Sequence, residues 1–343
     1  MTNIHTFIEG IPKAELHMHL EGCIEPDMMF ALAERNGLSL RWPSPEALRA
    51  AYAFKELQSF LDLYFEGCRV LVKERDFYDV TYRYLRQAHE QNVRHAEMFI
   101  GPQTFVERGT PLAQLMEGVL GAMRDARRDA GITSGLLISA HRHRSEAEAL
   151  ELLESIMPWK TQIAGIGMGG AELPHPPSKF VEFFGRCRSY GFPVTIHAGE
   201  EGPADYVRQA VDLLHVNRID HGNACLTDTD LVKTLAARRI PLTVCPLSNV
   251  KLNVVDATAP HPLRAMLDAG LCATINSDDP PYFGGYVNEN FMFVQQNLQL
   301  SRSEIVQLAK NSFEASFIER SVADAYIQYV DDYDKSFPEN VQV

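Results

Sequence analysis

The chain has 343 residues, of which 45% are hydrophobic and 22% are charged, and its formal net charge is −13. These fractions are those of an average soluble globular protein, so they exclude a disordered chain, and no apolar run of 18 residues occurs that would cross a membrane. The negative charge argues against a nucleic-acid partner, which would need a basic face, and favours an enzyme acting on small molecules.

Six cysteines are scattered along the chain without a C-x-x-C spacing, so we expect them to be reduced and mostly buried. Residues 1–13 lack a basic start followed by an apolar run, which predicts no secretory leader. We therefore expect a cytoplasmic protein without a membrane partner. The sequence does not indicate the oligomeric state.

The segment Ala14–Gly22, with sequence AELHMHLEG, is typical of a β-strand. A period of two places His17 and His19 on one face of this strand. Helical patterns follow at 27–36 and 76–91, and the strongest helical period of the chain spans 56–72. That stripe indicates either core packing or a lid over a pocket.

A regular alternation of short apolar runs and helical patterns begins at Arg94. The predicted strands are 94–100, 134–140, 163–168, 193–197, 218–221, 241–245 and 272–276. The predicted helices between and after them are 111–130, 145–156, 178–190, 204–214, 228–238 and 262–269. With the first strand, these units predict a (β/α)₈ barrel over residues 1–343 as one domain, with extra helices after the first strand and from 301 to 329. A doubly wound open sheet is the alternative, but no glycine-rich fingerprint follows the first strand.

Polar residues of ligand type collect where these strands end, the edge at which (β/α)₈ barrels carry their active sites. The fifth strand ends in the sequence TIHAGEEGP, which contains His197 and Glu200. The sixth ends at His221 in RIDHG, and the eighth continues into NSDDPP with Asp278 and Asp279. Two adjacent carboxylates repel each other unless a cation or hydrogen-bond donors lie between them.

We expect His17, His19, His197 and Asp278 to bind one divalent cation per chain. Mixed imidazole and carboxylate ligands suit Zn²⁺, and other first-row metals are compatible. Such an ion lowers the pKa of bound water from 15.7 to about 7, so hydroxide becomes the nucleophile. Glu200 would then move a proton, and His221 would orient or deprotonate the water.

Two further motifs remain open. The fourth strand ends in GIGMGGAE, where the Gly170 N–H and the Glu172 carboxylate could read the edge of a flat ring, although a tight turn explains the glycines equally well. His95 and Glu97 match the H-x-E half of the cytidine deaminase signature, but the P-C-x-x-C half is absent. We therefore expect this pair in the core or behind the site.

The segments PKAELHMHLEG, HAGEEGP, RIDHG, PLTVCPLSNVKL and NSDDPPYFGGYVNENF resemble the adenosine/adenine deaminase family of the amidohydrolase superfamily over nearly the whole chain. DFYDVTYRYL, RHAEMF, HPPSKF and SDDPPYFGGY look most like its adenine deaminase branch. The resemblance implies a zinc-dependent (β/α)₈ hydrolase of purine salvage that converts adenine to hypoxanthine and ammonia.

Residue by residue, the resemblance implies that His17, His19, His197 and Asp278 are the zinc ligands. It implies that Glu200 protonates ring nitrogen N1, that His221 lies beside the hydroxide, and that Asp279 contacts N7.

Two departures bear on the substrate. Adenine deaminases usually carry an acidic, serine-containing turn at the position of residues 167–171, whereas this chain carries Gly-Gly, as adenosine deaminases do. Residues 98–101 also lack an aspartate that is common in adenine deaminases. A deaminase of adenosine or another 6-substituted purine is therefore the alternative. A non-catalytic metal-binding or purine-sensing barrel is a third hypothesis, and the presence of Glu200 as a proton carrier argues against it.

Overall fold

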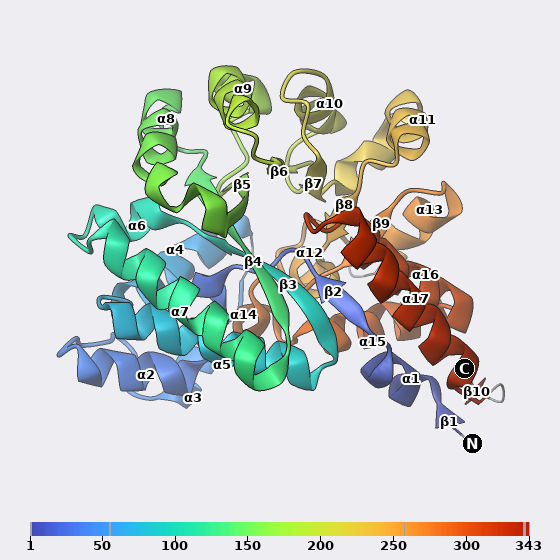
Figure 1. The fold of residues 1–343 in the computed structure, drawn as a ribbon, viewed down its shortest axis with the longest axis horizontal. Coiled ribbons are helices and arrows are strands. Elements are labelled where there is room, and N and C mark those ends of the chain that lie inside the picture. Colours follow the sequence, from blue (N-terminus) through green and yellow to red (C-terminus); the bar gives the residue numbers. More distant parts are fainter. Residues whose placement is uncertain (1, 55, 257, 339–340, 343) are drawn as a thin grey trace.

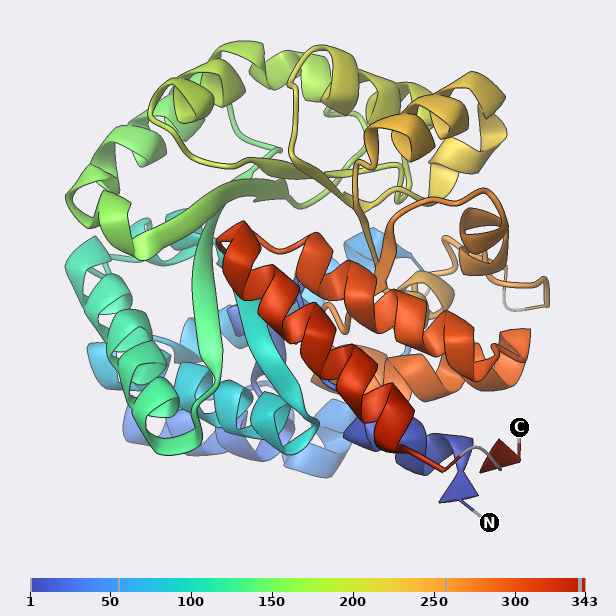
Figure 2. The same cartoon turned by 45° about the vertical axis from the view of Figure 1, so that its right-hand side comes forward.

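The protein, seen here as a computed structural model, is described over residues 2–54, 56–256, 258–338 and 341–342. Eight parallel strands form a barrel at its centre, as Figures 1 and 2 show. The strands are β2 (Lys13–Glu15), β3 (Val93–Ile100), β4 (Thr133–His141), β5 (Ile163–Gly169), β6 (Thr195–Ala198), β7 (Arg218–His221), β8 (Leu242–Val244) and β9 (Ala273–Ile275).

The barrel consists of two four-stranded sheets, ordered β2-β3-β4-β5 and β6-β7-β8-β9. Single bridges join the two sheets, one from Ile166 to Val194 and one from Met18 to Asp278. The second bridge lies beyond the ends of β2 and β9, where the expected ligands lie. The prediction of a (β/α)₈ barrel is confirmed.

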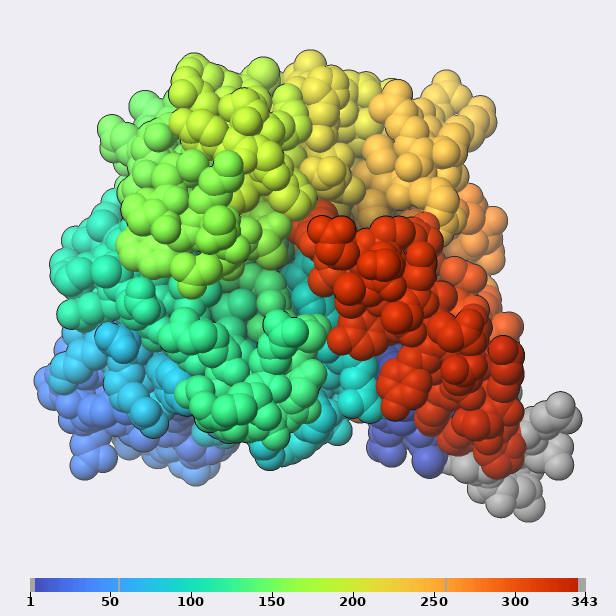
Figure 3. Space-filling model, in the orientation of Figure 1, coloured from blue at the N-terminus to red at the C-terminus, as the bar shows by residue number. Residues whose placement is uncertain are grey.

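Helices surround the strands on the outside (Figure 2). They are α1 (Ile4–Gly10), α2 (Pro26–Arg35), α3 (Pro45–Ala50), α4 (Leu57–Gly67), α5 (Glu74–Glu90), α6 (Pro102–Val106), α7 (Leu112–Ala130), α8 (Glu146–Ser155), α9 (Val181–Ser189), α10 (Ala204–Asp212), α11 (Thr229–Arg238), α12 (Pro246–Lys251), α13 (Leu263–Asp268), α14 (Pro280–Phe283), α15 (Val287–Leu298), α16 (Arg302–Glu314) and α17 (Arg320–Ser336). Near the chain ends, β1 (Thr2–Asn3) pairs with β10 (Val341–Gln342). Figure 3 shows the C-terminal part of the chain, coloured red, on the outer surface of the molecule. Among the described residues, no helix is both long and apolar enough to cross a membrane.

The first strand is shorter than predicted. It ends at Glu15, because the backbone beyond it bonds to the loop after β9 and not to a regular ladder: Asp278 N donates to His17 O at 3.0 Å, and His19 N donates to Asp278 O at 3.0 Å. The backbone at His19 is still extended, with φ −93° and ψ 123°. The alternation of side chains therefore persists as far as the second histidine.

Two other predicted boundaries are wrong. The helix predicted over 56–72 ends at Gly67 and continues as a 3₁₀ turn over Cys68–Val70. A Cβ at Gly67 would lie 2.5 Å from the Tyr282 hydroxyl, so this close approach favours glycine there. At the C-terminal end, α17 continues to Ser336, beyond the predicted end at residue 329, and Asp334 in its last turns accepts from Arg302 Nε at 2.7 Å. The six cysteines are free and buried, as predicted.

Candidate active site

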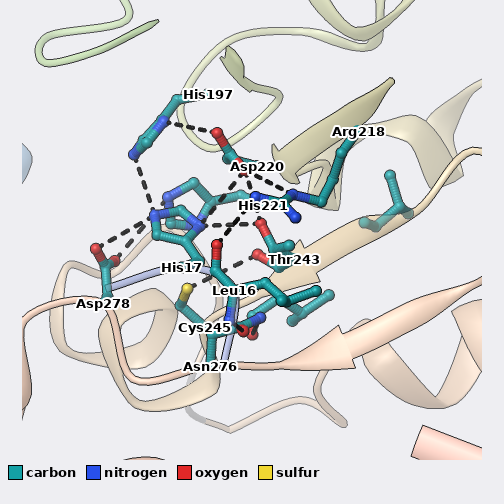
Figure 4. A network of polar contacts seen from close by, with 12 residues as sticks. Leu16, His17, His197, Arg218, Asp220, His221, Thr243, Cys245, Asn276 and Asp278 are labelled. Carbon is teal, nitrogen blue, oxygen red and sulfur yellow. Dashed lines mark hydrogen bonds and ion pairs between the residues drawn. The ribbon is translucent and has the colours of Figure 1, made fainter. Parts of the chain in front are cut away.

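The four expected metal ligands converge at the end of the barrel where β2, β6 and β9 terminate. Figure 4 shows three of them, His17, His197 and Asp278. His17 Nε2 lies 3.1 Å from His197 Nε2, and His19 Nε2 lies 3.3 Å from the same nitrogen. Asp278 Oδ1 is 3.5 Å from both His17 Nε2 and His19 Nε2. Residues from distant parts of the chain thus present three nitrogens and one oxygen to a common point.

The hydrogen bonds behind His17 indicate that this convergence suits a cation. Thr243 donates its hydroxyl hydrogen to Asp220 Oδ1 at 2.9 Å, so its oxygen accepts from His17 Nδ1 at 3.0 Å. The hydrogen of neutral His17 is therefore on Nδ1, and Nε2 offers a lone pair to the cluster. Burial, with neighbouring imidazoles adding to it, lowers the pKa of His17 and His19 well below the usual range. Neutral imidazoles beside a carboxylate are the form that binds metal, so the residues fit a metal ion.

Two residues of the site adopt a left-handed backbone that side chains disfavour. His221 has φ 65° and Asp278 has φ 63°. Such conformations cost about 1–3 kcal/mol each and are concentrated at functional sites, where the surrounding structure imposes them. Here His221 is the last residue of β7 and Asp278 is the third residue after β9, and both side chains lie at the cluster.

Glu200 and His221 lie side by side next to the metal ligands. Glu200 Oε2 is 3.5 Å from His221 Nε2, and His221 Nε2 is 4.0 Å from Asp278 Oδ2. Burial and then the charge of Asp278 raise the pKa of Glu200 well above its usual range, which favours a protonated carboxyl. The Asn249 amide nitrogen lies 3.3 Å from His221 Nδ1, so Nδ1 accepts and Nε2 carries the hydrogen of the neutral ring.

Glu172, which we expected to read the edge of a ring ligand, lies elsewhere. Its Oε1 accepts from Gly199 N at 2.7 Å, and its Oε2 accepts from three successive backbone N–H groups over 200–202 at 2.9–3.0 Å. A carboxylate satisfied by four amides has little capacity left for substrate, and Glu172 does not line the cavity. Its contacts instead hold the loop that carries Glu200.

Asp279 and Gly170 do line the cavity. Asp279 is buried, and its Oδ1 has no hydrogen-bond partner among the described residues. A Cβ at Gly22 would lie 1.6 Å from this oxygen, so the glycine allows the carboxyl to reach its position. An unpaired buried acceptor that faces a cavity is available to a ligand.

The sequence did not identify the network beneath the ligands (Figure 4). Asp220 Oδ2 lies 3.4 Å from His197 Nδ1, and Arg218 lies behind it with Nε 3.9 Å from Asp220 Oδ1. Arg218 Nη1 in turn donates to Glu97 Oε2 at 2.6 Å. Glu97, paired with His95 at 3.4 Å, is therefore in the core, as expected for that motif. The sequence signal that could have revealed this network is Asp220, the aspartate of the RIDHG segment.

The cavity above the cluster is small, about 50 Å³. The apolar face of α4 covers it, through Leu57, Phe60, Leu61, Tyr64 and Phe65. The apolar stripe predicted over 56–72 thus does both things that were expected as alternatives: it packs in the core and it covers the cavity. Ser139 and His141 at the end of β4 also line the cavity and were missed, although polar residues that end a buried strand were the signal used elsewhere.

Comparison with known proteins places these residues in context. The profile of the adenosine deaminase family matches residues 12–333. An adenine deaminase of Rhodopseudomonas palustris is 61% identical over 333 residues, which are 97% of each chain. The crystal structure of an adenine deaminase from Arthrobacter aurescens has a TM-score of 0.93 at 46% identity, covering 95% of this chain and 100% of its own. An amidohydrolase from Burkholderia ambifaria with bound zinc has a TM-score of 0.89 at 29% identity, covering 97% and 94%.

Proposed function

This chain belongs to the adenosine deaminase family, and from that premise we infer that it is an adenine deaminase. It adds water to adenine at C6 and releases ammonia and hypoxanthine. One observation carries this inference: relatives that align with nearly the whole chain are adenine deaminases. The cluster of three imidazoles and a carboxylate beside Glu200 supports it.

We propose that the metal is one zinc ion held by His17, His19, His197 and Asp278. When bound, it supplies a Lewis acid that makes water nucleophilic at neutral pH. Mixed nitrogen and oxygen ligands favour zinc, and the zinc-bound neighbour from Burkholderia supports the choice.

The remaining roles follow from the protonation of the side chains. Glu200 is the proton donor to ring nitrogen N1, since burial raises the pKa of its carboxyl well above the usual range and so favours the protonated form. His221 directs its Nε2 hydrogen toward the attacking oxygen and orients it. Burial and then the charge of Asp278 raise the pKa of Asp279 well above its usual range, so its carboxyl can donate a hydrogen to N7, and the Gly170 N–H would face the ring. Together these contacts place C6 over the cluster.

The test is turnover of adenine and of adenosine by zinc-loaded protein, followed by purine absorbance. Adenine turnover with little adenosine turnover supports the proposal, and the reverse would replace it by adenosine deamination. Glu200→Gln should lower kcat by roughly 10²–10⁴ while bound metal stays stoichiometric. Glu201→Gln, which neutralises the adjacent carboxylate, is the matched control and should retain activity.

A further inference from the structure

The residues around the cavity divide between the two halves of the barrel. The proposed catalytic groups follow β6, β7 and β9, together with the segment after β2. In the closed order β2-β3-β4-β5-β6-β7-β8-β9, the strand opposite the middle of this group is β4. The cavity wall that faces the catalytic groups is therefore built by the ends of β3, β4 and β5.

This facing wall carries few polar side chains. Its cavity-lining residues are Gly101, Ser139, His141, Gly169 and Gly170. Glycines offer only backbone groups, so Ser139 and His141 are its polar side chains. Both come from β4, two positions apart, and thus share one face of that strand.

The Ser139 hydroxyl has no partner within the described part of the protein. Ser139 is 6% exposed and lines the cavity, and no hydrogen bond joins its hydroxyl to another described residue. Its oxygen is not among the fully buried polar atoms that lack a partner, so it is open to the cavity. Polar groups in the interior are normally satisfied by protein, water or a ligand, and this hydroxyl is therefore available to a ligand atom.

His141 is held in place beside it. Its Nε2 lies 2.9 Å from the Thr104 hydroxyl on α6, and its backbone N donates to Gln103 Oε1 at 2.8 Å. A Cβ at Gly101 would lie 2.9 Å from His141 Nε2, so glycine lets the ring pack against the backbone. The imidazole is thus a fixed wall of the cavity rather than a mobile surface side chain.

The chemistry of adenine assigns an edge to this wall. When C6 faces the catalytic groups, N3 and N9 lie on the opposite edge of the ring system. A nucleoside carries its ribose on N9, whereas the free base carries nothing larger than hydrogen there. We propose that Ser139 and His141 bind the N3–N9 edge of adenine and that the His141 ring occupies the space an N9 substituent needs. This inference rests on the proposed function and makes these two residues the determinants of free-base specificity.

The experiment compares adenine with its N9-methylated derivative as substrates of the zinc-loaded full-length enzyme. Ser139→Ala should raise KM for adenine about two- to tenfold with kcat nearly unchanged, because one neutral hydrogen bond to bound substrate is lost. His141→Ala should improve kcat/KM for the methylated base relative to adenine by roughly tenfold or more, because it opens the space beside N9. His143→Ala is the matched control, since this exposed imidazole two residues further along does not line the cavity, and it should leave both values unchanged.

The outcomes separate this inference from the function on which it rests. Wild-type enzyme that does not deaminate adenine contradicts the proposed function itself. If wild type does deaminate adenine, an unchanged KM in Ser139→Ala and an unchanged substrate ratio in His141→Ala overturn the inference alone. Equal use of adenine and the methylated base by wild type also overturns it. Thermal melts check folding, and His141→Asn provides the comparison if His141→Ala does not fold.

Discussion

Replacing Arg218 by Met tests whether the buried network beneath the metal ligands stabilises the protein. Arg218 and Glu97 are 0% and 1% exposed, and Arg218 Nη1 donates to Glu97 Oε2 at 2.6 Å. The guanidinium also donates to Leu16 O at 3.2 Å, directly before the first ligand, and to Ala315 O at 3.1 Å. Methionine retains most of the apolar stem but leaves the Glu97 carboxylate buried without its cation.

The expected loss is large because an uncompensated buried charge is costly. Removing one partner of a buried ion pair destabilises a protein by about 3–5 kcal/mol. An unfolding entropy of about 2.1 cal/mol/K per residue gives roughly 0.7 kcal/mol/K for 343 residues. Arg218→Met should therefore lower the melting temperature by about 4–7 °C.

Thermal unfolding followed by circular dichroism, at equal metal loading, measures this change. Arg239→Met is the matched control, because Arg239 forms a two-bond pair with Glu314 but is 49% exposed. Its loss should be below about 1 kcal/mol. The double variant Glu97→Leu/Arg218→Met should recover part of the loss, since it buries no charge. A melting temperature of Arg218→Met equal to that of the Arg239 control would refute the reasoning.

Three further predictions follow from the site and its support. Gly22→Ala places a Cβ 1.6 Å from the present position of Asp279 Oδ1, so it should displace this carboxyl and lower kcat/KM for adenine while the fold persists in circular dichroism. Removal of metal by a chelator should abolish turnover and lower stability by roughly 4 kcal/mol relative to protein at a thousandfold excess of free metal over its Kd, with recovery on adding zinc. Burial alone would raise the pKa of Glu97, but Arg218 and His95 lower this pKa overall in the folded protein. The ionised Glu97 therefore stabilises the fold at every pH above its unfolded pKa of about 4.3. This contribution is lost as the pH falls through the lower pKa of the folded state. Denaturant titrations of wild type and Arg218→Met should accordingly give a stability difference that narrows from pH 7 toward pH 3.

Much of the fold was predictable because its signals are local. Short apolar runs separated by helical periods identified all eight barrel strands. Two of the helices also begin with local caps in the structure: Ser145 accepts from Glu148 N, and Asp228 accepts from Leu231 N. The boundaries that failed depend on contacts from elsewhere. The bonds of the first strand to the loop after β9, and the Tyr282 hydroxyl beside Gly67, have no local signature.

The site divides in the same way. The ligand types at strand ends identified the residues that meet in the cluster. Glu172 carried an equally suggestive signal, yet its carboxylate is used by four backbone amides. In the sequence, nothing distinguishes Asp220, Ser139 and His141 from other polar residues of strands. Only the closed barrel shows that Asp220 contacts the proposed metal ligand His197, whereas Ser139 and His141 line the cavity.

The amino-acid sequence by itself determined which segments are strands or helices and which side chains can bind metal or move protons, because periodicity and chemical type are properties of neighbouring residues. The tertiary structure alone decided which of those side chains meet, which are already satisfied, and which wall faces the catalytic groups. The physical reason is that hydrogen bonds, burial and distances between residues far apart in the chain arise only when parallel strands close into a ring.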